Sequence, residues 1–379
     1  MTVPLQPAPT PPTAGGAPAP PVKFPLGWLL DHGAPPIQYR AIADVARLPG
    51  AASDPISALP YGFLPAVRLA LSQSPEGEWG ATMLSIGRGD KFEGIGTINA
   101  VRRLLEYGWS PESPPLAKVR RLLFRLLAED EDPAFLFEFG GKPEEEEMAR
   151  RGRAMLREAA AATLAQAGYE ADPRLRGAAR RIIERINTYL KSLPVNGMRP
   201  AWVRVGNRQV LPAEATPPSM YAIMMLAFMP QFRSEYHEHV ERLYQFLSQP
   251  LPRQESVQLV GTTPVMQPHL VLGDLLPHRN AVDADVPFAL VWMELLARLG
   301  FLRRNENWSR LFERFLDDRD RLGIWHPHKG LDSPRSEHPL AWACYPLVDE
   351  RVEGEARWAD VTFRLGLIAR ISGRTIELI

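Results

Sequence analysis

Apolar residues recur three and four positions apart along almost the entire chain beyond residue 24, and this spacing constrains the fold more than any other feature. Such a period places the apolar side chains on one face of an α-helix that can pack on a core. Alternation of apolar and polar residues, which is typical of strands, is found at 201–212, where we expect a small β-hairpin. The sequence therefore predicts an all-α fold. The helical period occurs at residues 55–73, 97–108, 115–130, 148–168, 174–193, 239–249, 286–300 and 307–323.

Glycine follows several of these periodic segments and is itself followed by an apolar residue, in Gly108-Trp109, Gly168-Tyr169, Gly300-Phe301 and Gly366-Leu367. A glycine directly after a helix adopts the left-handed conformation at little cost, and the next residue can pack back on the last turn. We therefore predict a helix end at each glycine. Their intervals indicate a helical hairpin repeated every roughly 60 to 66 residues, which would build an open solenoid or a closed ring of inner and outer helices.

Composition limits the remaining classes of protein. Residues 1–23 are rich in proline and alanine, and we interpret them as a disordered tail before one domain at 24–379. Lys+Arg and Asp+Glu both total 44, so no basic surplus favours nucleic acid. No window holds the roughly 18 apolar residues of a membrane-spanning helix, which leaves peripheral membrane contact open. The one cysteine, Cys344, excludes an internal disulfide and is typical of a reducing, cytoplasmic location.

The stretch Gln73-x-x-x-Gly77-x-Trp79 stands between two periodic segments. A glutamine at a helix end can donate to unpaired carbonyl groups, glycine permits a tight turn, and tryptophan can cover that turn. We interpret the motif as a structural staple between helices. Gly323 and Trp325 repeat its spacing, with Arg319 in place of the glutamine.

This motif, together with the glycine-flanked helix that follows it at 92–109, resembles the QW repeat of squalene and hopene cyclases. The opening at 24–45 is also similar to the first helix pair of bacterial proteins identified as prenyltransferase or squalene-oxidase-repeat proteins. The resemblance implies an α/α-toroid, the closed ring also seen in the β subunits of protein prenyltransferases. It further implies a central cavity for an isoprenoid or another small apolar ligand.

Triterpene cyclases of this superfamily protonate their substrate with a DxDD motif, which is absent here. The nearest substitutes are Asp283 and Asp285, and the resemblance makes them the candidate catalytic acids. Both precede the apolar segment 286–300, so capping of that helix is the structural alternative. The run at 317–320, with acids at Asp317, Asp318 and Asp320, is only loosely similar to a metal-diphosphate motif, and its neighbouring arginines favour a solvated helix end.

No metal site and no cofactor are predicted, with zinc and magnesium as the alternatives. Protein prenyltransferases hold zinc with a D-x-C pair and a histidine, but Trp342 stands where that pattern has its Asp before Cys344. His338 or Asp349 could complete a three-ligand site, although the spacing does not predict one. A buried, inert thiol is the structural alternative for Cys344.

Aromatic rings stabilise cations through their electron-rich faces, and three aromatic residues are our candidate ligand-binding residues. These are Trp292, Trp342 and Tyr345, on segments that we expect to face the centre. Ordinary core packing is the alternative for each ring.

Two functional hypotheses from different classes follow. In the first, the chain is a terpenoid-cyclase-like or prenyltransferase-like protein that binds an isoprenoid in an apolar funnel, where Asp283 or Asp285 initiates the reaction. In the second, it is a noncatalytic toroid that binds a lipid, a peptide or a partner protein. A centre filled with side chains and exposed acids would favour the second, whereas an empty aromatic cavity with a buried carboxylate would favour the first.

Overall fold

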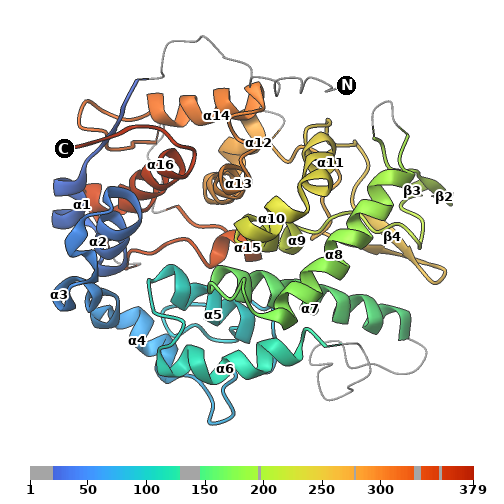
Figure 1. Ribbon diagram of the computed structural model, residues 1–379, viewed down its shortest axis with the longest axis horizontal. Helices are drawn as coiled ribbons and strands as arrows, with labels where there is room; N and C mark the ends of the chain where they lie inside the picture. The colour runs from blue at the N-terminus through green and yellow to red at the C-terminus, as the bar shows by residue number, and fades with distance from the viewer. Residues whose placement is uncertain (1–19, 129–145, 195–197, 277–278, 328–333, 350–351) are drawn as a thin grey trace, which may run out of the picture.

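The computed structural model describes residues 20–128, 146–194, 198–276, 279–327, 334–349 and 352–379 (Figure 1). Helices make up 54% of the structure and strands 9%, which confirms the predicted all-α class with small β elements. The described ranges contain no helix whose length and hydropathy would allow it to cross a membrane.

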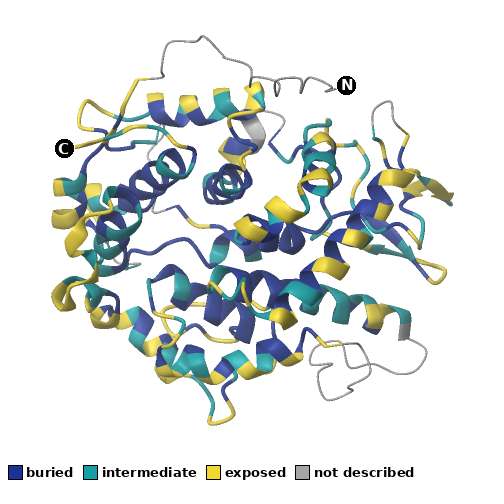
Figure 2. Ribbon diagram, in the orientation of Figure 1, coloured by how far each residue is buried: buried dark blue, intermediate teal, exposed yellow. Residues whose placement is uncertain are grey.

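The longer helices fall into two groups that differ in burial (Figure 2). One group is buried on nearly every side over much of its length, including several of its charged residues. It consists of α5 (Thr97–Glu106), α7 (Glu146–Gln166), α9 (Met220–Ala227), α13 (Val286–Arg298) and α16 (Ala359–Ile371). The other group buries one face and exposes the opposite one, and consists of α4 (Leu64–Leu71), α6 (Pro114–Arg125), α8 (Pro173–Ser192), α11 (His237–Leu247) and α14 (Glu306–Asp317).

The buried helices pack in chain order, α5 against α7, α7 against α9, α9 against α13, and α13 against α16. Helix α16 also packs against α2 (Pro35–Arg40) and the π-helical turn η1 (Ala41–Ala46). In Figure 1 the short α15 (Pro339–Trp342) lies near the centre of the view, with α5, α9, α13 and α16 around it. The remaining short helices are α1 (Leu26–His32), α3 (Asp54–Ser57), α10 (Pro230–Glu235) and α12 (Arg279–Ala284).

Three of the four predicted glycine stops end helices. Gly108, Gly168 and Gly300 have φ angles of 87°, 87° and 76°. At the first of these, the Trp109 amide donates to the Leu104 carbonyl and the Gly108 amide to Leu105, a pattern that satisfies two of the last carbonyls of α5. The predicted stop at Gly366 is wrong.

Gly366 lies inside α16, which continues to Ile371 and ends before Gly373, a residue with φ 76°. A Cβ atom on Gly366 would lie 2.3 Å from two ring carbons of Phe24. This glycine therefore permits close packing between α16 and the beginning of the chain. In a sequence, a glycine required for close packing looks the same as one that ends a helix.

The periodic run 55–73 is also divided, into α3, the 3₁₀ turn η3 (Leu59–Gly62) and α4. Pro60 and Pro65 each stand in the first two positions of a new helical turn. A proline ring in a helix interior would clash with the preceding turn. The helix is therefore interrupted at each proline, although the spacing of apolar residues continues through both.

In the described ranges, three pairs of strands accompany the helices. The predicted hairpin at 201–212 is confirmed by β2 (Val203–Val205) and β3 (Arg208–Val210), which pair antiparallel. A second hairpin, β4 (Val257–Val260) with β5 (Thr263–Met266), was not predicted. Strand β1 (Val22–Phe24) pairs parallel with β6 (Ile376–Leu378), so the domain boundary predicted at residue 24 falls inside a strand, whereas residues 1–19 of the predicted tail lie outside the described ranges.

The Gln73 motif links three helices. The Gln73 side-chain amide donates to the carbonyls of Gly77 and Pro115, both at 2.9 Å, and so joins the end of α4 to the start of α6. The buried Trp79 indole donates to the Leu69 carbonyl at 2.7 Å. The Trp79 backbone amide donates to the Thr97 hydroxyl at 3.0 Å, which ties the loop to the start of α5.

The loop around Gly323 repeats the backbone bonds of this arrangement, although the Trp325 indole, unlike that of Trp79, has no hydrogen-bond partner in the described residues. The Asp320 amide donates to the Ile324 carbonyl at 2.8 Å, as the Ser74 amide does to Glu78. The Trp325 amide donates to the Thr362 hydroxyl at 3.0 Å, as Trp79 does to Thr97. Arg319, in place of glutamine, donates to the Lys23 carbonyl of β1 at 2.8 Å. Both loops thus connect a one-sided helix, a buried helix and the next element of the fold.

Candidate functional site

Residues 334–349 lie among the buried helices, and we call them the central segment. Apart from the short α15 in its middle, this segment is not helical. Two neighbouring arginines of α5 hold it by its backbone. Arg102 donates to the Pro339 and Leu340 carbonyls at 3.1 and 2.9 Å. Arg103 donates to the Tyr345 carbonyl at 3.1 Å and to the carbonyls of Trp342 and Pro346.

Asp360 of α16 holds the end of the central segment. Its two carboxylate oxygens accept from the Leu347 amide, at 2.9 and 3.0 Å, and one of them also accepts from the Val348 amide. Burial raises the pKa of Asp360 to about 6, although these hydrogen bonds and the nearby arginine charges act in the opposite direction.

The pKa of Asp360 predicts a pH dependence of stability. A carboxyl whose pKa is higher in the folded than in the unfolded state contributes most below the unfolded value, near pH 4, and that contribution is lost as the pH rises through 6. We expect the unfolding free energy of the native chain to fall relative to Asp360→Asn by about 2 kcal/mol between pH 4 and pH 7. Urea titrations of both proteins across this range measure the difference, in which the other titrating groups cancel. A constant difference would contradict the raised pKa.

His338 begins α15 as its N-cap. The Leu340 amide donates to Nδ1 of His338 at 3.2 Å, and the imidazole ring packs on Phe288 of α13 with 4.4 Å between ring centroids. Burial lowers the pKa of His338 to about 4, so the ring is neutral at pH 7 with Nδ1 free to accept.

A pocket of about 660 Å³ opens over the central segment. One wall is the loop between Ser85 and Phe92, and the other is formed by residues 335–337 and by Trp342, Tyr345 and Pro346. Arg103 lines this pocket and also an adjoining one of about 330 Å³, which includes Arg68, Asp90 and Asp349. We call the two together the central pocket.

The loop on one side of the central pocket is held by α5. The Asn99 side-chain amide donates to the Leu84 carbonyl at 2.6 Å, and the Gly96 and Ile98 amides donate to Ser85 and Met83. The first N–H groups of α5 are therefore occupied by the chain itself. A Cβ on Gly87 would lie 3.0 Å from the Phe92 Cα atom, so a larger residue there would require the loop to shift slightly.

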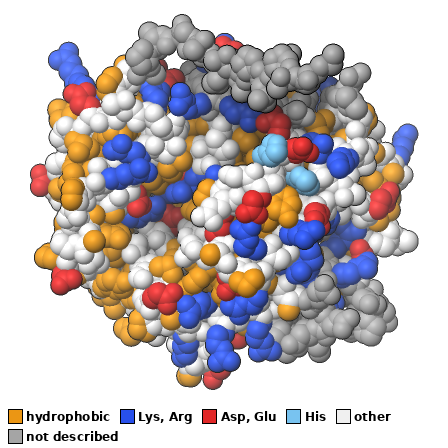
Figure 3. Space-filling view, viewed as in Figure 1, with side chains coloured by type: hydrophobic (Ala, Val, Ile, Leu, Met, Phe, Trp, Pro, Cys, Tyr) orange, Lys and Arg blue, Asp and Glu red, His pale blue; other side chains and the backbone are white. Residues whose placement is uncertain are grey.

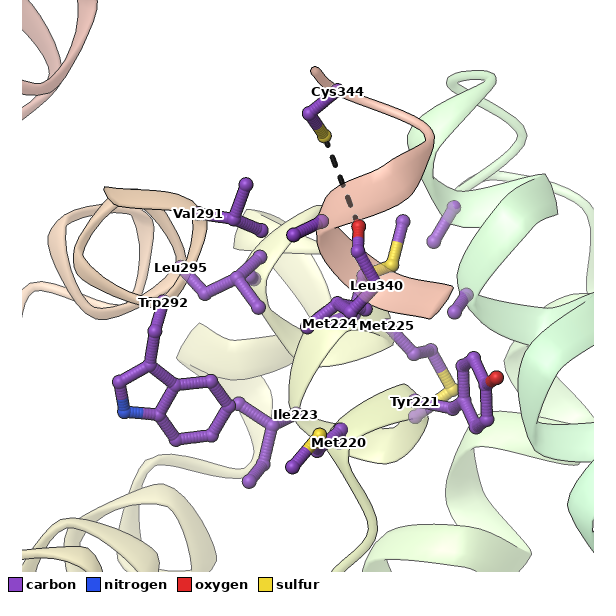
Figure 4. Close-up of a cluster of buried hydrophobic side chains, with 14 of the residues drawn as sticks. Met220, Tyr221, Ile223, Met224, Met225, Val291, Trp292, Leu295, Leu340 and Cys344 are labelled. Carbon is purple, nitrogen blue, oxygen red and sulfur yellow. Dashed lines mark hydrogen bonds between the residues drawn. The ribbon is translucent and has the colours of Figure 1, made fainter. Parts of the chain in front are cut away.

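The central pocket includes two of the three predicted ligand-binding residues. Trp342 and Tyr345 both line it, and the Tyr345 hydroxyl is buried without a hydrogen-bond partner in the described residues. Trp292 does not line it. Figure 4 shows the Trp292 ring in the hydrophobic core beside Ile223 of α9, and its neighbour Phe288 stacks on it with 6.3 Å between centroids.

The two predicted catalytic acids have structural partners. Asp283 is exposed and pairs with Arg314 of α14. Asp285 is the N-cap of α13 and accepts from the Phe288 amide at 2.9 Å, as the capping alternative requires. Its second oxygen accepts from the Ser336 hydroxyl at 2.5 Å, and Ser336 lines the central pocket.

The metal alternatives find little support among the described residues, in which no group of three or more His, Cys, Asp or Glu is placed to hold an ion. Cys344 is buried, and its thiol points to the Leu340 carbonyl (Figure 4). Burial raises the pKa of that thiol to about 12, which keeps it protonated. Asp320 of the acidic run accepts instead from the Leu322 and Ile324 amides within the Gly323 loop.

A cluster of buried charges lies next to the central segment and was not predicted. We define it as Arg40, Glu106, Glu294 and Arg364, from α2, α5, α13 and α16. Arg364 donates to Glu294 at 2.5 Å and to Glu106 at 3.0 Å, and Arg40 donates to Glu106 at 2.6 Å. Burial alone would raise the pKa of Glu106, but the two arginines hold it well below its usual range, so all four groups are charged at neutral pH.

Each residue of this charge cluster lies within an otherwise regular helical period, where an arginine or glutamate normally indicates a solvated face. The sequence carried no signal to the contrary: in α5, Asn99, Arg102, Arg103 and Glu106 recur three and four positions apart like an ordinary solvated face, yet each is at most 5% exposed.

These features define a mostly helical protein with a mixed polar and aromatic pocket over an internally clamped segment. The chain matches no protein-family model, no curated protein and no solved structure. Its function must therefore be inferred from the geometry alone.

Proposed function

We propose that the chain is a noncatalytic α/α-toroid that binds a small ligand in the central pocket. The buried helices α5, α7, α9, α13 and α16 would form the inner ring, and the one-sided helices the outer ring. Two observations support closure. The Gln73 loop bonds to the next outer helix at Pro115, whereas the matching Gly323 loop bonds to Lys23 in β1, which therefore takes the place of the next outer element. The parallel pairing of β1 with β6 joins the same two ends.

The occupied centre carries the argument for a noncatalytic role. An isoprenoid cyclase needs a dry apolar cavity, in which an acid protonates an alkene and water is excluded. Here the central segment fills that space, and Arg102, Arg103 and Asp360 bind seven of its backbone groups. What remains open is a pocket with both polar and aromatic walls, of a volume that suits a small ligand.

One observation favours the enzymatic alternative, a terpenoid-cyclase-like or prenyltransferase-like activity. The Asp285 carboxylate contacts the pocket through Ser336, and Trp342 and Tyr345 line the same pocket. In that alternative Asp285 would supply the proton and the aromatic rings would stabilise the cation.

A product assay distinguishes the two functions. The purified protein is incubated with squalene, farnesyl diphosphate or geranylgeranyl diphosphate, each with and without magnesium, and the extracts are analysed by gas chromatography and mass spectrometry. We expect to recover only the starting material. A new cyclic hydrocarbon or alcohol would refute the noncatalytic proposal.

Two asparagine variants would then locate the acid. Asparagine is as good an N-cap as aspartate, so Asp285→Asn keeps α13 capped while it removes the proton donor. Asp283→Asn is the matched control, because Asp283 is exposed and pairs with Arg314 outside the pocket. Turnover lost only in Asp285→Asn would establish the enzymatic alternative.

A further inference from the structure

We propose that the ligand of the central pocket is an organic anion with a flat apolar body, an inference that rests on the proposed binding function. The anionic group would lie against Arg103 and the rim arginines Arg88 and Arg335, and the apolar body would lie on Phe92 and Trp342.

Arg103 is a buried cation that makes no direct ion pair in the described residues, although the Asp360 carboxylate of α16 is near enough to interact with its charge. Arg103 is 5% exposed, and no carboxylate lies within ion-pair distance of it in the described part of the chain. Its hydrogen bonds go to neutral acceptors, namely the Tyr107 hydroxyl and the carbonyls of Trp342, Tyr345 and Pro346. These bonds use four of the five guanidinium N–H groups, so one N–H remains for a ligand.

The buried arginines of this protein are held in two ways. Arg102, which is 1% exposed, donates to backbone carbonyls as Arg103 does, but it does not line the central pocket. Arg40 and Arg364 are as deeply buried as Arg103, yet both pair with Glu106. A buried charge is costly unless it is paired. Arg103 has no direct ion pair and is compensated by carbonyl dipoles, by the rings of Trp342 and Tyr107, 5.1 and 5.0 Å away, and at longer range by the Asp360 carboxylate. An anion in the central pocket would complete the compensation.

The rim of the larger part of the pocket carries positive charge, as Arg103 does. Arg88 and Arg335 are exposed there, against one carboxylate, that of Glu337. In the adjoining part, Arg68 is within 3.7 Å of Asp90, and Asp349 adds a second carboxylate. The larger part, lined by Arg103 and the two rim arginines, is therefore the more positive one, although Lys, Arg, Asp and Glu side chains are interspersed over the molecular face seen in Figure 3.

Two aromatic rings complete the site. The ring of Phe92 stands edge-on to Trp342, with 6.3 Å between centroids and 87° between planes. Trp342 is half-buried, so part of its ring faces the pocket. A flat apolar group beside the arginines would gain contact with both rings.

A matched pair of fluorescent probes tests the charge preference. The compound 8-anilinonaphthalene-1-sulfonate carries one anionic group, and N-phenyl-1-naphthylamine has the same rings without it. We expect the sulfonate to bind the native protein at least about tenfold more tightly than the neutral amine, because the Arg103 charge, which has no direct ion pair, acts in a site of low dielectric constant. Octanoate and octyl phosphate, added as competitors, would show whether a carboxylate or a phosphate fits better, whereas octanol should not compete.

Variants at the rim of the central pocket test whether the probe binds there. Arg88→Gln and Arg335→Gln should each weaken sulfonate binding about threefold, as expected for exposed charges, and leave binding of the neutral probe unchanged. Arg253→Gln, which removes an exposed arginine outside the described pockets, should change neither. Equal affinities for the two probes, no binding of the sulfonate, or no effect of either rim variant would overturn the anion inference. The product assay is independent of these results, so failure of this inference and failure of the noncatalytic proposal remain distinguishable.

Discussion

Replacement of Arg364 by methionine should destabilise the protein by about 3 to 5 kcal/mol, the usual effect of removing one partner from a buried ion pair. Arg364 is 1% exposed and is the residue that joins Glu106 to Glu294. Its loss leaves Glu294 with the part-buried Arg298 and Glu106 with Arg40, while two carboxylates stay in a region from which water is excluded. Since domains are stable by only about 5 to 15 kcal/mol, much of the total would be lost.

Urea unfolding followed by circular dichroism measures this effect. The matched control is Arg304→Met, because Arg304 pairs with Glu241 through side chains that are 44% and 46% exposed. That pair should contribute less than about 1 kcal/mol. If both variants shifted the unfolding free energy by the same small amount, the charge cluster would not be a major source of stability.

Trp79→Ala should cost a similar amount, about 3 to 5 kcal/mol, because it removes a large buried side chain and leaves a cavity. Trp79 is 1% exposed, and the change would also leave the Leu69 carbonyl without its indole donor. The loop would keep the bonds that Gln73 makes, so we expect a weakened junction between α4 and α5 in a protein that still folds.

The control for this change is Trp202→Ala, which removes a half-buried tryptophan next to the β2–β3 hairpin. Thermal unfolding of both variants gives the comparison. Equal melting temperatures would show that Trp79 adds nothing beyond ordinary surface packing, contrary to its role as a staple.

Local patterns in the sequence predicted local structure well. The stops at Gly108, Gly168 and Gly300 follow from backbone conformation alone, and the hairpin at 201–212 follows from the alternation of apolar and polar residues. Gly366 was misassigned because a glycine required by a neighbouring ring, that of Phe24, looks the same in a sequence as one required by a positive φ.

The candidate site could be predicted only in part. Trp342 and Tyr345 were expected at the centre, and both line the central pocket. The hydrogen bonds that hold the central segment were not predicted. They join Arg102 and Arg103 to backbone carbonyls more than 230 positions away, and carbonyl groups carry no sequence signal. The charge cluster was missed because pairing between distant helices depends on the tertiary fold, which turns residues of ordinary helical faces inward.

The parallel pairing of β1 with β6 has a mechanical consequence. In the pair, Val22 lies opposite Ile376 and Phe24 opposite Leu378, so Val22 and Leu378 stand at opposite ends of the two strands. A pulling force applied through these two residues runs along the strands and loads their hydrogen bonds together in shear, instead of opening them one at a time. The seam between the first and last elements should therefore be a point at which the molecule resists extension.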